Sequence, residues 1–124
     1  MMKEEHDLKE RTKQFALRII RLFGSLPKTT ESQVLGKQVL RSGTSVGANY
    51  REAHRGRSKA EFIAKCGDSL RELEETAYWL ELLVDAEIVA AAKLQPLRNE
   101  CDELTAIFVT IIKRAREGGS QKTE

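Results

Sequence analysis

Apolar residues recur at alternating steps of three and four along four separate stretches of this chain. The stretches cover residues 8–22, 35–53, 63–84 and 94–115. Such spacing places the apolar side chains of each stretch on one face of an α-helix, whereas a strand would need a period of two. The pattern therefore predicts four amphipathic helices that share one core.

The pattern is interrupted where helices are expected to end. Residues 24–27, Gly-Ser-Leu-Pro, close the first stretch, and Thr29 or Thr30 can cap the second. Ser58 precedes Glu61 by three residues, which is typical of a capping box at the start of a helix. The predicted helices therefore cover about 5–24, 30–55, 58–85 and 89–117.

Short connections between long helices favour an all-α, antiparallel, up-down-up-down four-helix bundle. Residues 1–117 form this single domain, and the polar residues 118–124 are expected to be a disordered tail. A proline removes a hydrogen bond from a helix interior, so we expect Pro96 in the first turns of the fourth helix or at a kink.

The second predicted helix carries two unusual faces beside its polar surface. Its apolar face includes two polar residues, Ser42 and Asn49, and buried polar groups need hydrogen-bond partners. We therefore expect Asn49 to fix the register between helices, and we favour this role over ligand binding. A neighbouring face holds Gly36, Gly43, Gly47 and Tyr50. Each helical glycine costs about 1 kcal/mol relative to alanine. These glycines therefore indicate close backbone approach, either by another helix of the bundle or by another subunit.

Five cations lie opposite the apolar face of this helix or just beyond its end. They are Lys37, Arg41, Arg51, Arg55 and Arg57. One interpretation is a solvated face paired with acids such as Glu72, Glu74 and Glu75. The other is a nucleic-acid contact that neutralises phosphates. No recognised nucleic-acid motif and no interleaved aromatic residues accompany the stripe, so both interpretations remain open.

The net charge of +2 conceals a segregation of charge along the chain. Residues 36–65 contain seven Lys or Arg and two acids, whereas residues 68–103 contain ten acids and three Lys or Arg. Segregation of this kind favours pairing within or between subunits, and it can also leave a basic face for nucleic acid.

Residues with the spacing of a catalytic or metal site are missing. The two His residues cannot form a metal centre, and Cys66 and Cys101 lie on core stripes as small buried hydrophobes of a reducing compartment. We therefore expect no enzyme activity, no cofactor and no metal. No apolar run reaches the roughly 20 residues of a membrane span, and the polar start is not a secretory signal. A cytoplasmic protein without membrane contact is expected.

Two segments carry a resemblance to a known family. Residues 40–65 contain Arg41-Ser42, Asn49 and Gly56-Arg57, and residues 69–83 contain the run Glu-Leu-Glu-Glu-Thr at 72–76. Both resemble the bacterial four-helix-bundle proteins called 23S rRNA intervening-sequence proteins, over about residues 8–117. The order at 67–69, Gly-Asp-Ser, departs from the usual Gly-Ser-Leu.

The resemblance implies a four-helix bundle assembled as a homopentamer, with a poorly defined molecular activity. A related branch, the accessory protein of diversity-generating retroelements, works beside a reverse transcriptase and binds nucleic acid. The positions that recur in the family correspond to Arg41, Ser42, Asn49, Glu52, Gly56 and Arg57. Two functions follow as hypotheses: an oligomer that binds RNA or other nucleic acid without strong sequence preference, and a scaffold that contacts only protein partners.

Overall fold

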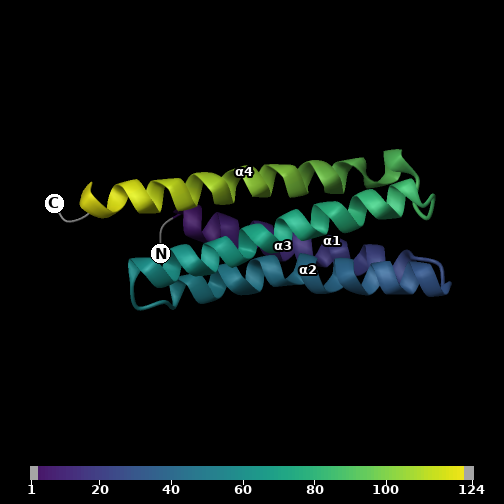
Figure 1. Ribbon diagram of the computed structural model, residues 1–124, viewed down its shortest axis with the longest axis horizontal. Helices are drawn as coiled ribbons and strands as arrows, with labels where there is room; N and C mark the ends of the chain where they lie inside the picture. The colour runs from purple at the N-terminus through teal and green to yellow at the C-terminus, as the bar shows by residue number, and fades with distance from the viewer. Residues whose placement is uncertain (1–2, 122–124) are drawn as a thin grey trace.

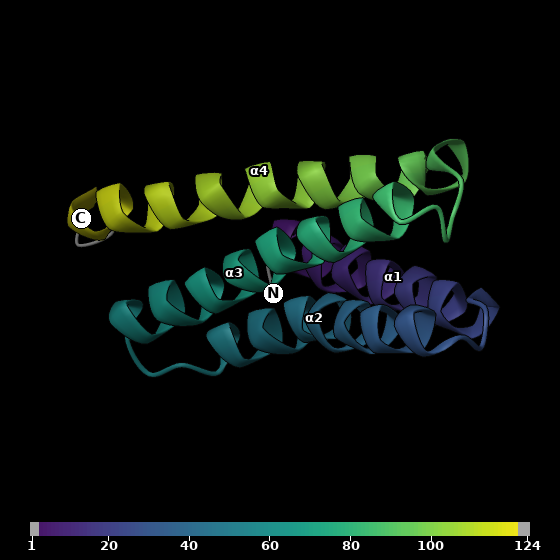
Figure 2. The same cartoon turned by 45° about the vertical axis from the view of Figure 1, so that its right-hand side comes forward.

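Four long helices make up the structure, a computed structural model that describes residues 3–121, with side chains described for 7–118. They are α1 (Lys3–Ser25), α2 (Thr30–His54), α3 (Lys59–Asp85) and α4 (Ala91–Gln121). Successive helices run in opposite directions, and in two views α3 runs between α2 and α4 (Figures 1 and 2). The described residues contain no strand, and the predicted all-α four-helix bundle is confirmed.

The helix starts follow the capping residues of the sequence. Thr29 accepts a hydrogen bond from the Ser32 backbone N–H at 3.3 Å, and Ser58 accepts one from the Glu61 N–H at 3.1 Å. The carboxylate of Glu61 in turn accepts the backbone N–H of Arg57 at 2.6 Å, one residue before the cap of the expected capping box. Side-chain acceptors thus satisfy N–H groups that the first turn of a helix leaves without partners.

The last helix is longer than its sequence pattern indicated. It begins at Ala91, so Pro96 lies in its second turn, and it continues to Gln121. The expected end of the helical domain at residue 117 is therefore too early, since Gly118 does not end the helix. Residues 122–124 of the expected disordered tail lie outside the described part of the chain.

The core is built from the predicted apolar stripes. Its largest fully buried side chains include Phe15, Val46, Leu80 and Phe108, one from each helix. The α2–α3 and α3–α4 contacts are extensive, whereas α1 and α4 touch little. Arg11 of α1 links these two helices with hydrogen bonds of 2.7 and 2.8 Å to Glu100 of α4. These hydrogen bonds raise the pKa of the Arg11 guanidinium above its ordinary value.

A buried polar ladder fixes the register of α2 against α3. Thr76 donates to Ser42 at 2.7 Å, and Ser42 donates to the Gln38 carbonyl at 2.9 Å. About two turns away along α3, Ser69 donates to the Val46 carbonyl at 2.8 Å. Because every hydroxyl in this ladder has a hydrogen-bond partner, its burial does not incur the free-energy penalty of an unpaired polar group. None of the described helices is apolar enough over sufficient length to span a membrane.

Candidate nucleic-acid interface

The glycines of α2 pack against the first helix of the same chain and against the segment that follows it. The buried glycines are Gly36, Gly43 and Gly47. A β-carbon at Gly43 would lie 2.7 Å from Cγ1 of Ile19, and one at Gly47 would lie 2.9 Å from the hydroxyl oxygen of Thr12. Real side chains do not approach so closely, so glycine is what allows α1 and α2 to meet here. This contact within one chain accounts for the glycines.

The other residues predicted to lie at a helix-packing or oligomer surface differ in how deeply they are buried. Tyr50 is buried, with its ring edge-to-face against His54 at 4.6 Å and against Phe108 at 5.5 Å. Ser42 is fully buried in the α2–α3 ladder. Asn49 is only half-buried, so the expected position inside the core is wrong for this residue, which lies at the edge of the apolar face.

Arg41 is neutralised by the third helix. Its guanidinium is ion-paired with Glu72 at 3.2 Å and with Glu75, and Glu75 also accepts the indole N–H of Trp79 at 3.1 Å. Two of the three acids proposed as partners are thus used, whereas the exposed Glu74 makes no ion pair with Arg41. Arg41 is therefore paired with acids, as the first interpretation of the stripe predicted.

The remaining cations of the stripe have a different environment. They are Lys37, Arg51, Arg55 and Arg57, all of them exposed. Within the described residues no acid forms an ion pair with any of the four. The nearby Glu52 is paired with Lys65 at 3.0 Å, and Glu61 caps α3. The predicted stripe therefore divides into one compensated arginine and four uncompensated cations.

Two lysines of α1 join the uncompensated cations, and the stripe of α2 did not reveal them. Lys13 lines a pocket between α1 and α2, together with Arg51. Lys9 precedes Lys13 by four residues and therefore lies on the same side of α1. The spacing of four is visible in the sequence. It predicts a shared basic surface only when α1 is known to lie beside this face of α2.

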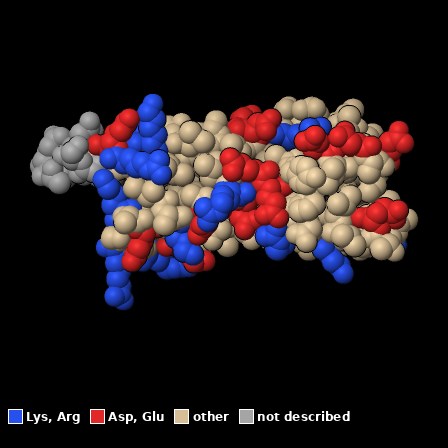
Figure 3. Space-filling view, viewed as in Figure 1, with Lys and Arg blue, Asp and Glu red and all other residues tan. Residues whose placement is uncertain are grey.

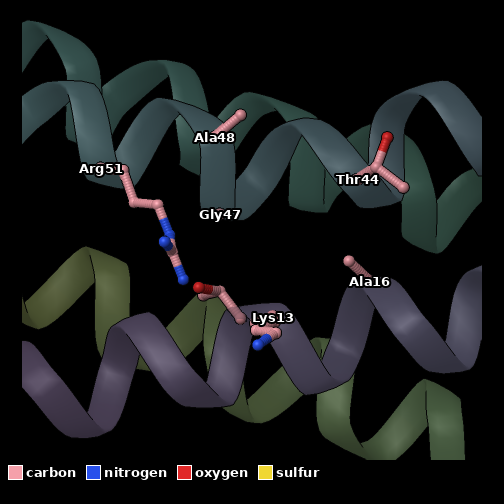
Figure 4. A pocket seen from close by; sticks show the side chains of 7 residues that line it. Lys13, Ala16, Thr44, Gly47, Ala48 and Arg51 are labelled. Atoms are coloured by element: carbon pink, nitrogen blue, oxygen red, sulfur yellow. The ribbon is translucent and has the colours of Figure 1, made fainter.

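The pocket is a hollow of about 350 Å³ between α1 and α2, beside the contact of Gly47 with Thr12. Small side chains leave it open: Thr12, Ala16, Thr44, Gly47 and Ala48. The Arg51 side chain extends from α2 across the gap toward α1 (Figure 4). Neither wall contributes an acid to the lining, so the hollow is positively charged.

One end of the bundle is also basic. Exposed cations gather where α2 and α4 end and α3 begins: Arg55, Arg57, Lys59, Lys113, Arg114 and Arg116. On the face seen in Figure 3, blue side chains dominate this end, whereas red side chains lie over the middle of the bundle and toward the opposite end. Charge that is segregated along the chain is thus also segregated in space.

Groups that could bind a metal do not gather in the described part of the chain. No three His, Cys, Asp or Glu residues there are placed to hold a metal ion. Cys66 and Cys101 are free, fully buried thiols, and burial raises the pKa of each to about 12. A thiol with so high a pKa is a poor nucleophile at neutral pH, so the cysteines serve the core.

Comparison with known proteins agrees with this architecture. No curated protein matches the chain. A similar solved structure is that of a protein of unknown function from the S23 ribosomal protein family of Bacteroides thetaiotaomicron VPI-5482. It is 39% identical, with a TM-score of 0.83, and the match covers 88% of this chain and 97% of that one. Residues 4–110 match the family described as 23S rRNA-intervening sequence protein. The chain therefore belongs to the 23S rRNA-intervening sequence protein family.

Proposed function

We propose that this protein is a non-enzymatic, cytoplasmic oligomer that binds RNA or other nucleic acid through its basic surface. The observation that carries the proposal is the set of exposed cations without acidic partners among the described residues, Lys37, Arg51, Arg55 and Arg57, beside Lys13 of α1. Phosphates can pair with these cations directly, because no internal ion pair must first be broken. Arg41, held by Glu72 and Glu75, is outside the binding surface.

The surface is suited to the backbone of the nucleic acid more than to its bases. The aromatic residue of this part of α2, Tyr50, is buried in the core and offers no face for base stacking. Binding would rest on neutralised phosphates, which gives affinity without strong sequence preference and a steep dependence on salt. The proposal is therefore the first of the two hypotheses, binding without strong sequence preference.

The proposal includes assembly into a homopentamer, which the resemblance described above implies. It is supported by large apolar side chains left at the surface of the single chain, one on each helix: Ile20, Val34, Tyr78 and Val109, each about half exposed. Exposed apolar surface marks contact with other proteins where it forms a contiguous patch, so the interfaces of the ring would bring some of these side chains together. A ring would repeat the basic surface around its circumference and multiply its charge.

Fluorescence anisotropy of a labelled structured RNA, titrated with the protein at several salt concentrations, tests the binding proposal. We expect measurable affinity at low salt that falls linearly on a log–log scale as salt rises. Absence of binding at the lowest salt would contradict the proposal. The second candidate, a scaffold that contacts only proteins, would then be favoured, since the Arg41 pairs and the exposed apolar side chains suffice for it.

A further inference from the structure

We propose that the pocket between α1 and α2 is a subsite for one phosphodiester group, held between Lys13 and Arg51. The identity of the ligand rests on the proposed nucleic-acid binding, but the pocket itself does not. It hollows the basic surface where α1 meets α2, and its second cation, Lys13, lies outside the stripe of five that the sequence indicated.

The shape of the pocket follows from the glycine contact. The helices are in tight contact where Gly47 faces Thr12, because any β-carbon at position 47 would lie 2.9 Å from the threonine oxygen and 3.6 Å from its backbone carbonyl carbon. Just outside this contact Ala16 and Ala48 have side chains too short to fill the space between the helices. A volume of about 350 Å³ is at the lower end of ligand pockets, and it suits a phosphate with an adjoining sugar.

The charge of the pocket selects an anion. Lys13 belongs to the α1 wall of the pocket and Arg51 to the α2 wall, and the Arg51 side chain reaches across the gap toward α1 (Figure 4). Both walls therefore supply a cation for an anion bound in the pocket. Arg51 has no acidic partner among the described residues, and its guanidinium offers a fork of N–H donors that matches phosphate oxygens. Lys13 adds a point charge on a flexible stem.

The hydroxyls in the lining limit what else the pocket can recognise. Thr44 donates to the Leu40 carbonyl of its own helix at 2.7 Å, and Thr12 donates to the Leu8 carbonyl at 2.8 Å. Since both hydroxyl protons are already used, the two cations supply the donors for an incoming ligand. Such a site recognises the charge of a phosphate in any sequence context, which fits backbone binding.

The first test replaces Ala48 with glutamate. Position 48 is exposed on a helix, where glutamate is well tolerated, and the new carboxylate would occupy the pocket beside Arg51. Ala106→Glu on α4 is the matched control, since it makes the same charge change at an exposed alanine away from the pocket. We expect Ala48→Glu to weaken RNA binding about tenfold or more and to lower the log–log salt slope by at least about 0.7–0.9, with little change in Ala106→Glu.

Equal effects of Ala48→Glu and Ala106→Glu on RNA binding would overturn the subsite while leaving the proposed function in place. Single and double replacements of Lys13 and Arg51 by alanine provide a second set of variants should Ala48→Glu fail to fold. If both cations hold one phosphate, the losses of RNA-binding free energy in the two single variants should not add up to the loss in the double variant. Additive losses would contradict a shared ligand.

A second test examines the pocket without relying on RNA affinity. The dinucleotide UpU, which has a single phosphodiester, would be titrated into the ¹⁵N-labelled protein, with uridine and inorganic phosphate as comparisons. We expect saturable shifts of the amides of Lys13, Ala48 and Arg51 with UpU and none with uridine. Shifts with inorganic phosphate alone would overturn the phosphodiester assignment, and unchanged amides with every probe would overturn the site. Failure of RNA binding with UpU shifts present would instead reject only the proposed function.

Discussion

Gly47 of α2 faces Thr12 of α1 so closely that a β-carbon at position 47 would lie 2.9 Å from the threonine hydroxyl oxygen and 3.2 Å from its β-carbon. Thr12 is fully buried, and its hydroxyl is already bound to the Leu8 carbonyl at 2.8 Å. The threonine therefore cannot move aside without breaking a buried hydrogen bond. The separation of α1 and α2 is fixed at this point.

We predict that Gly47→Ala destabilises the protein. The added methyl group should cost about 2–3 kcal/mol by overpacking, since the buried Thr12 cannot give way, and this exceeds the gain of about 1 kcal/mol in helix propensity. Thermal melting followed by circular dichroism should show a fall of a few degrees. Gly67→Ala is the control, because nothing lies within 4 Å of a β-carbon at that helical position, and there we expect a rise in melting temperature. A rise in both variants would contradict the tight contact.

The periodic features of the fold could be predicted from the sequence. Apolar residues at steps of three and four specify amphipathic helices, and the start of each middle helix carries a cap signal: Ser58 for α3, and Thr29 or Thr30 for α2, of which Thr29 is the cap. The end of α4 could not be predicted in the same way. Gly118 indicates a stop in the sequence, but glycine costs a helix only about 1 kcal/mol, and α4 continues to Gln121.

The electrostatic environment of the candidate site could be predicted only in part. Arg41 and Arg51 belong to the same stripe of α2, yet the first contacts acids of α3 and the second points toward α1. Which neighbour each arginine meets depends on how α2 is rotated between α1 and α3, and a stripe does not reveal that rotation. The same uncertainty of phase placed Asn49 inside the core, whereas it is only half-buried at the edge.

The buried ladder between α2 and α3 gives a second prediction. Ser69→Ala removes the 2.8 Å hydrogen bond to the Val46 carbonyl and should lower the free energy of unfolding by about 0.5–1.5 kcal/mol. Ser45→Ala is the matched control, since the Ser45 hydroxyl donates only to the Arg41 carbonyl of its own helix. Denaturant unfolding of both variants measures the difference. Equal stability of the two variants would show that the ladder does not hold α2 to α3.

The cysteines give a prediction about pH. Burial raises the pKa of Cys66 and Cys101 from 9.0 to about 12, so the folded protein keeps both protons where the unfolded chain loses them. The contribution to stability is therefore fully present below pH 9 and is lost as pH rises from 9 toward 12. Alkylation by iodoacetamide at pH 8 should be slow in the folded protein and fast in denaturant. Rapid alkylation of the folded protein would contradict the buried, neutral state of the thiols.

Assembly is predicted to produce a closed homo-oligomer, with the pentamer expected. Multi-angle light scattering at micromolar concentration should give a mass near five times the 14.0 kDa of one chain. Charged replacement of the exposed apolar residues Val34 and Tyr78 should reduce this mass if they lie between copies. A wild-type mass near that of one chain would contradict the proposed assembly.

The central claim is that uncompensated cations bind nucleic acid and that compensated ones do not. The most direct measurement is the salt dependence of RNA affinity, by fluorescence anisotropy, for Arg51→Gln and Arg41→Gln, which change the net charge equally. We predict that Arg51→Gln weakens binding and lowers the log–log slope by about 0.7–0.9 for each phosphate that is no longer neutralised, whereas Arg41→Gln leaves the slope unchanged. Identical slopes for both variants and the wild type, or no binding by the wild type at low salt, would contradict the claim.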